Sequence, residues 1–154
     1  MKTETYIRRS RMEASAARVY AWHASPDALE KLTPPGEPVK VVEKTGGIER
    51  GARVVLEVGK WPLRKRWVAV HGEFEVGHFF TDQQVSGPFA YWKHTHTFEP
   101  QGEAASILED RVEYALPFGF LGRWFGGWFV RRKLEKLFKF RHEVTAREVM
   151  SSKK

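Results

Sequence analysis

Two histidines, His94 and His96, alternate with other residues in a stretch rich in aromatic side chains. Side chains of a β-strand alternate between its two faces, so Trp92 and Phe98 share a face with both histidines. Lys93 lies on the other face and is expected to point to water, which places the histidines inside. Histidine titrates near neutral pH, so such a pair can bind a polar group, move a proton or hold a metal ion.

The next predicted strand adds an acid and a phenol to the same interior. Asp110 and Tyr114 alternate with Glu109, Arg111 and Glu113, and the charged positions are expected outside. An earlier strand contributes Trp67 and His71. Alternation leaves open which face of that strand His71 lies on. The sequence therefore predicts an inner wall on which a few polar groups lie among aromatic side chains.

Four interpretations of this wall stay open. A buried aspartate needs a partner, so His94, His96 and Asp110 could form a purely structural polar network. The same groups could anchor the polar end of a ligand in an otherwise apolar pocket. They could also act in acid–base catalysis, with Asp110 orienting one imidazole.

The fourth interpretation is a metal site. Alternate residues of a strand lie about 6.5 Å apart at their Cα atoms, a spacing at which His94 and His96 could bind one ion with Asp110 as third ligand. No further cluster of histidines or cysteines supports it, so no metal is assigned. Phosphate-loop and dinucleotide-binding fingerprints are missing from the sequence, and no cofactor is expected.

The elements that must position these residues follow a simple order. Residues 6–12 predict a strand, and residues 16–23 a helix with Ser15 as N-cap. A second short helix is expected to begin at Pro26, with Ser25 as its N-cap. About six glycine-punctuated strands then run to Leu116, and a long helix follows Pro117 to about Met150.

Composition sets the class of protein. With 154 residues, 42% of them hydrophobic and 14% aromatic, the chain is expected to form one globular domain spanning residues 1–154. It contains no cysteine, and its first residues lack the pattern of a signal peptide, so a cytoplasmic location is expected. A sheet of this length must bury one face, and only the final helix is long enough to cover it.

The C-terminal helix carries the charge of the protein. Residues 120–154 hold ten basic and three acidic residues, which equals the whole net charge of +7. Helical spacing predicts one stripe that faces the sheet, formed by Val130, Leu134, Leu137, Phe138, Arg141 and Val144. A second patch falls on the opposite side, formed by Leu121, Trp124, Phe125 and Trp128.

The position of Trp124 and Trp128 on the wrong side of the helix has several explanations. We favour a break at Gly126-Gly127, which would fold residues 118–127 into a lid over the cavity mouth. Alternatively, the aromatic side chains and neighbouring arginines form a peripheral contact with an anionic membrane. The charge run could also be a solvated face. Nucleic acid is not expected as a partner, because no nucleic-acid-binding motif accompanies the basic residues.

Several short motifs connect these elements to a known superfamily. The order of the first elements, together with Pro26-Asp27-Ala28-Leu29, resembles the opening of START-like (SRPBCC, helix-grip) proteins. Later motifs resemble an uncharacterised ligand-binding branch of that superfamily, found beside or fused to sugar-epimerase-like domains; they are Phe80-Thr81-Asp82-Gln83, Gly87-Pro88-Phe89, Trp92 to Phe98, Asp110-Arg111-Val112-Glu113-Tyr114 and Leu116-Pro117.

This resemblance implies an α+β helix-grip fold, in which a curved antiparallel sheet of about six or seven strands wraps around the long C-terminal helix. It also implies a deep cavity, and a role in binding or carrying an apolar or amphipathic small molecule such as a lipid, isoprenoid or aromatic metabolite. One fold hosts binders and enzymes alike, so a cyclase-like or hydrolase-like enzyme remains the alternative. The residues expected at the ligand are Trp67, His71, Trp92, His94, His96, Phe98, Asp110, Tyr114, Trp124 and Trp128.

Overall fold

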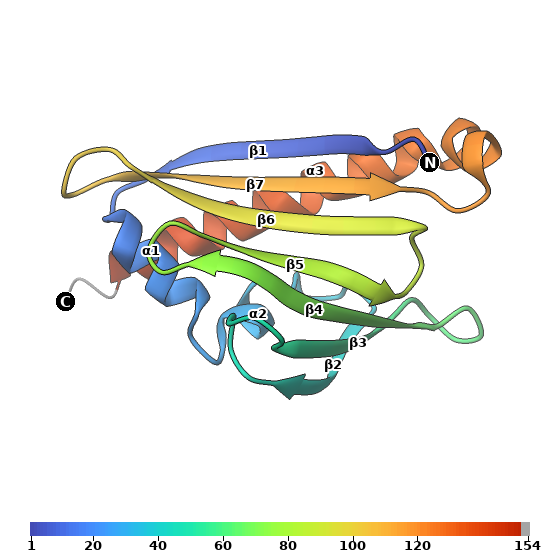
Figure 1. Ribbon diagram of the computed structural model, residues 1–154, viewed down its shortest axis with the longest axis horizontal. Coiled ribbons are helices and arrows are strands. Elements are labelled where there is room, and N and C mark those ends of the chain that lie inside the picture. Colours follow the sequence, from blue (N-terminus) through green and yellow to red (C-terminus); the bar gives the residue numbers. More distant parts are fainter. Residues whose placement is uncertain (152–154) are drawn as a thin grey trace.

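Seven antiparallel strands form one curved sheet in the order β1-β7-β6-β5-β4-β3-β2, and helices lie against one of its faces (Figure 1). The computed structural model describes residues 1–151 of the chain. Consecutive strands from β2 to β7 are hairpin neighbours, and β1 closes the other edge beside β7. The strands are β1 (Glu4–Met12), β2 (Val39–Thr45), β3 (Arg53–Val58), β4 (Lys65–Glu75), β5 (Phe79–Ser86), β6 (Tyr91–Pro100) and β7 (Ser106–Ala115). The predicted helix-grip fold is confirmed.

Two short helices follow β1, as predicted. Helix α1 (Ala16–His23) begins after Ser15, whose Oγ accepts a hydrogen bond from the backbone N–H of Arg18, so this N-cap is confirmed. The predicted start of the second helix is wrong, because α2 spans Ala28–Lys31 with Asp27 at the N-cap. The Ser25 hydroxyl instead donates a hydrogen bond back to the carbonyl of Trp22.

Helix α3 (Gly119–Ser151) runs without a break and lies across the sheet (Figure 1). Its predicted inner stripe is confirmed, since Leu134, Phe138 and Val144 are buried. The predicted break at Gly126-Gly127 and the folded lid are wrong. Glycine costs a helix only about 1 kcal/mol per residue relative to alanine, so two glycines weaken the helix without ending it. Among the described residues, no helix combines the length and apolar character needed to cross a bilayer.

The predicted alternation along β6 and β7 is confirmed. Along β6, from Trp92 to Phe98, every second residue is buried, and Asp110 and Tyr114 are buried on β7. The register of the sheet sets His96 opposite Asp110 of β7. On its other side, β6 sets His94 opposite Asp82 of β5. Three neighbouring strands thus bring two histidines and two aspartates together on the inner face.

Two apolar clusters flank this polar group. One surrounds Tyr20 and Phe98 where α1 meets the sheet, and the other surrounds Tyr114 and Phe138 beneath the middle of α3. On β6 the histidines lie between Trp92 and Phe98, which belong to different clusters. The packed clusters therefore hold the strands that carry the polar group in fixed register.

Candidate functional site

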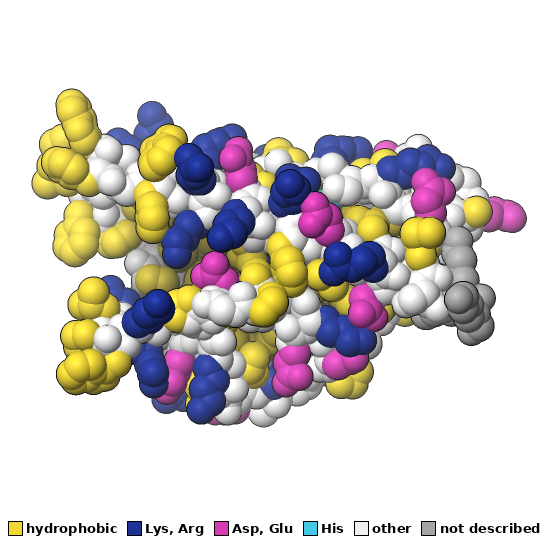
Figure 2. All heavy atoms as spheres, turned by 180° about the vertical axis from the view of Figure 1, so that it is seen from behind, with side chains coloured by type: hydrophobic (Ala, Val, Ile, Leu, Met, Phe, Trp, Pro, Cys, Tyr) yellow, Lys and Arg dark blue, Asp and Glu magenta, His cyan; other side chains and the backbone are white. Residues whose placement is uncertain are grey.

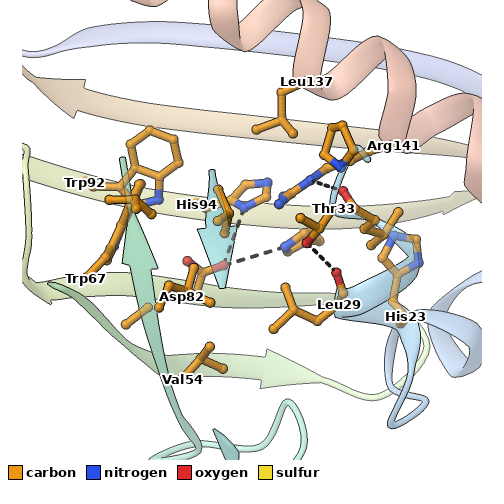
Figure 3. A pocket seen from close by; sticks show the side chains of 18 of the residues that line it. His23, Leu29, Thr33, Val54, Trp67, Asp82, Trp92, His94, Leu137 and Arg141 are labelled. Carbon is orange, nitrogen blue, oxygen red and sulfur yellow. Dashed lines mark hydrogen bonds and ion pairs between the residues drawn. The ribbon is translucent and has the colours of Figure 1, made fainter. Parts of the chain in front are cut away.

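A cavity of about 580 Å³ lies between the inner face of the sheet, the segment around α2 and helix α3 (Figure 3). Most of its lining is aliphatic or aromatic, with contributions from Leu29, Val54, Trp67, Trp92 and Leu137. Its polar wall is formed by His23, His71, Asp82, His94, His96 and Arg141. Three exposed lysines also line the cavity, namely Lys44, Lys133 and Lys136.

His94 and His96 are held between two carboxylates. On the far side from the cavity, His94 Nε2 lies 2.8 Å and His96 Nδ1 2.7 Å from Oδ1 of Asp110. On the cavity side, His94 Nδ1 lies 3.4 Å and His96 Nε2 3.6 Å from Oδ2 of Asp82. The His94 contact with Asp110 is a hydrogen bond, whereas the short contact of His96 with Asp110 lacks hydrogen-bond geometry. Each imidazole thus presents one nitrogen to each aspartate.

Asp110 is the hub of this network. It is 2% exposed, and its Oδ2 lies 2.7 Å from Nε2 of His142 on α3. The other ring nitrogen of His142 lies 2.7 Å from Oγ of Ser10 on β1. The carboxylate therefore links β7, β6 and α3. The histidines around it supply the hydrogen-bond partners that a buried charge requires.

The network shifts the protonation of its members. Burial by itself would raise the pKa of Asp82 and Asp110, but the surrounding histidines hold both well below their ordinary value. Burial would likewise lower the pKa of His94, but its contacts with Asp110 and Asp82 raise that pKa to about 9. The two carboxylates therefore favour the protonated form of His94.

Two further basic groups face the cavity. Burial, together with the nearby charge of His96, lowers the pKa of His23 to about 3, and its Nδ1 lies 2.9 Å from the carbonyl oxygen of Val19. Arg141, labelled in Figure 3, donates from Nε to the carbonyl of Leu32. Its guanidinium lies over the Phe138 ring. His23 thus lines the cavity as a neutral side chain, and Arg141 lines it as a charged one.

The structure places the sequence-predicted site residues in three groups. Five line the cavity, namely Trp67, His71, Trp92, His94 and His96. Three lie in the layer behind it, because Phe98 packs against Tyr20, Asp110 supports the histidines, and Tyr114 donates a hydrogen bond to Glu4. The last two, Trp124 and Trp128, do not line it: they are 78% and 73% exposed on the face of α3 that points away from the sheet.

The sequence-predicted site left out several residues that the structure brings to it, among them His23. Asp82 shares a face with Phe80, so alternation along β5 could have placed it inside. Arg141 was expected only as part of the packing stripe. His142 is 3% exposed and bonded to Asp110. No local pattern marks it, because its partners lie on β1 and β7.

Comparison with known families covers most of the chain. The sequence profile described as Polyketide cyclase / dehydrase and lipid transport matches residues 12–140. The chain belongs to this family. The family's description names both catalysis and transport, so membership fits a ligand cavity without deciding between a carrier and an enzyme. No curated protein sequence matches significantly.

Solved structures place this member of the polyketide cyclase and lipid transport family among START-like folds. Norcoclaurine synthase from Thalictrum flavum aligns with a TM-score of 0.76 and 16% identity, over 99% of this chain and 98% of that one. A START superfamily protein from Mycobacterium smegmatis gives 0.70 and 11%, over 96% and 97%. A nucleoside-diphosphate sugar epimerase from Corynebacterium glutamicum gives 0.74 and 21%, over 94% of this chain but 29% of its own length. At these identities the similarity concerns the fold.

Proposed function

We propose that the protein binds and carries an apolar or amphipathic small molecule in the cavity between the sheet and α3. The observation that carries this proposal is the cavity itself, about 580 Å³ with an apolar lining and its polar groups gathered on one wall. Ligand pockets of this size commonly combine such a lining with a few placed polar groups. The apolar part of the ligand would lie against Trp67, Trp92 and Leu137, and a polar end would meet His94, His96 or Arg141.

Filling the cavity tests this proposal. Ala69 lies on β4 and lines the cavity, so Ala69→Trp places an indole inside it. We expect at least about a tenfold loss of affinity for an apolar fluorescent probe such as a naphthalene sulfonate, because the added ring occupies the volume that the probe needs. Native mass spectrometry of protein purified without detergent should also show co-purified ligand on the wild type and not on the variant.

The matched control is Val85→Trp, at a 69% exposed position on β5. It adds the same side chain outside the cavity and should leave probe affinity and co-purified mass unchanged. Equal probe binding by wild type and Ala69→Trp, with both proteins folded by circular dichroism, would refute a ligand site in this cavity.

A second feature favours loading of the ligand at an anionic membrane. Large hydrophobic side chains gather at one end of the molecule in two groups (Figure 2). One group is the start of α3, with Phe118, Trp124, Phe125 and Trp128, and the other is the tip of the β3–β4 loop, with Trp61 and Leu63. Trp61 is 83% exposed. Exposed aromatic side chains of this kind suit the interfacial layer of a bilayer.

Basic residues stand directly behind both groups. Arg132 lies over the ring of Trp128 and Lys133 over that of Phe129. The loop that carries Trp61 is flanked by exposed basic residues, namely Lys60, Arg64, Lys65 and Arg66. Anionic headgroups attract such clusters by about 1 kcal/mol per basic residue near the surface. Lys133 lines the cavity and follows Trp128 by five residues on α3, so a docked protein would hold this part of the cavity near the bilayer.

Removing two indoles tests this docking. The double substitution Trp61→Ser with Trp128→Ser should lower binding to phosphatidylglycerol-containing vesicles by about tenfold, because less apolar area enters the interface. Co-sedimentation with vesicles measures it, and raised salt should weaken the wild type. Val76→Ser, at a 73% exposed position in the β4–β5 turn, is the control and should leave binding unchanged. Unaltered binding by the double variant would refute this membrane surface.

The enzyme alternative changes its residues in the light of the structure. Asp110 lies behind the histidines and does not line the cavity, so it could orient a base but not meet a substrate. Asp82, His94 and His96 do face the cavity. Acid–base chemistry by the predicted histidine pair would therefore involve Asp82 in place of Asp110.

A further inference from the structure

Three potential metal ligands converge on one point of the cavity wall. Asp82 Oδ2 faces Nδ1 of His94 at 3.4 Å and Nε2 of His96 at 3.6 Å (Figure 3). One ligand atom from each of the three residues lies within 4.8 Å of the other two. A tetrahedral ion bonded to nitrogen and oxygen at about 2.0–2.2 Å separates its ligands by about 3.3–3.5 Å. The spacing around Asp82 matches that separation.

The distances from the two histidines to the aspartates differ on the two sides of the pair, which an ordinary ion-pair network does not require. Toward Asp110 the contacts are 2.7 and 2.8 Å, the length of charge-assisted hydrogen bonds. Toward Asp82 they are longer by more than half an ångström, although Asp82 is flanked by the same two rings. The wider side leaves room between the ligand atoms, and it is the side that faces the cavity.

Asp110 supplies the support that a metal-binding histidine needs. Histidine ligands usually donate a hydrogen bond from their second ring nitrogen to a carboxylate or carbonyl, which fixes the ring and raises its basicity. Here His94 Nε2 and His96 Nδ1 both meet Asp110 Oδ1. The His94 contact is a hydrogen bond, and the His96 contact is equally short but lacks hydrogen-bond geometry. Asp110 is held in turn by His142.

The position also suits an ion by charge and access. Asp82 and Asp110 lie on opposite sides of the two imidazole rings, so the site holds two carboxylates that a divalent cation can balance. Asp82, His94 and His96 all line the cavity, so an ion could enter through it and keep coordination positions open toward a ligand.

We propose that Asp82, His94 and His96 bind one divalent transition-metal ion, with Asp110 orienting both histidines from behind. Two histidines and one carboxylate suit Zn²⁺ with an open position, and also Fe²⁺ or Co²⁺. This replaces Asp110, the third ligand considered from the sequence, with Asp82. The proposal goes beyond ligand carriage, because ion binding needs no occupant in the apolar part of the cavity.

The test uses full-length protein without a histidine tag, stripped with a chelator that is then removed. Calorimetric titration with Zn²⁺ should show one ion per chain. Titration with Co²⁺ should produce visible ligand-field absorption, which reports low-symmetry coordination by nitrogen and oxygen. His96→Ala and Asp82→Asn should each weaken Zn²⁺ binding at least about tenfold, because each removes one of three ligands.

His78→Ala is the matched control, since His78 is exposed and pairs only loosely with Glu75 at 3.9 Å. It should bind Zn²⁺ as tightly as the wild type, and circular dichroism should show all variants folded. Absence of stoichiometric binding by the wild type would overturn the proposal. So would equal binding by the wild type, His96→Ala and Asp82→Asn, which would place the ion elsewhere on the surface. Ala69→Trp separates the two proposals, because loss of probe binding alone leaves the metal result unaffected.

Discussion

Asp110→Ala is expected to lower the free energy of unfolding by about 3–5 kcal/mol at pH 7. The substitution removes the carboxylate that His94, His96 and His142 share. Removing one partner of a buried charged network leaves the other groups buried without a hydrogen-bond partner or water. Chemical denaturation followed by circular dichroism measures this loss. Domains of this kind are stable by about 5–15 kcal/mol in total, so the variant should unfold at a visibly lower denaturant concentration.

Glu113→Ala is the control for this loss. It removes a carboxylate from the same strand, but on the face that points away from the site. Its effect should stay within about 0.5 kcal/mol, as for surface substitutions in general. A loss of less than about 1 kcal/mol for Asp110→Ala would contradict the hub role and show that the three histidines find other partners.

His23 should make the protein less stable as the pH falls from 6.5 to 4.5. Burial and the neighbouring His96 lower the pKa of His23 to about 3. In this pH range the unfolded chain therefore binds a proton on His23 that the folded chain does not bind. Stability then rises with pH across the window and is lost on acidification. At about 1.4 kcal/mol per pH unit, the loss attributable to His23 is about 2–3 kcal/mol. His71, whose pKa burial also lowers, adds an effect of the same sign.

The variant His23→Phe isolates this contribution. Phenylalanine fits the aromatic surroundings of Phe80 and Phe98 and cannot titrate. In the presence of a chelator, its stability should change less with pH than that of the wild type, by about 2 kcal/mol over the window. His78→Ala, which removes an exposed histidine, should keep the wild-type slope. Equal slopes for the wild type and His23→Phe would mean that His23 is already protonated in the folded protein.

Most of the fold could be predicted from the periodicity of polar and apolar residues. Alternation of polar and apolar residues placed His94, His96 and Asp110 on one inner face, because a strand has a period of two whatever surrounds it. The stripe through Leu134 and Phe138 likewise identified the gripping face of the last helix. These are local properties, and the sequence contains all that is needed to read them.

Local signals failed where two weak effects compete. Gly126-Gly127 predicted a break, but a glycine pair only weakens a helix, and α3 continues through it. Ser25 is a good capping residue by type, yet its hydroxyl bonds backward to Trp22. Which of two small energies wins depends on neighbours that the sequence pattern does not name.

The sequence by itself determined the helix-grip fold with about six or seven strands, the inward histidine pair and the concentration of positive charge in the C-terminal segment. Only the tertiary structure showed that Asp82 closes the histidine pair on the cavity side while Asp110 supports it from behind, and that Arg141 and His142 reach the same wall. The physical reason is strand register and helix placement. A side chain's face follows from its own strand, but its partners follow from the pairing of strands far apart in the chain, and packing of the whole core sets that pairing.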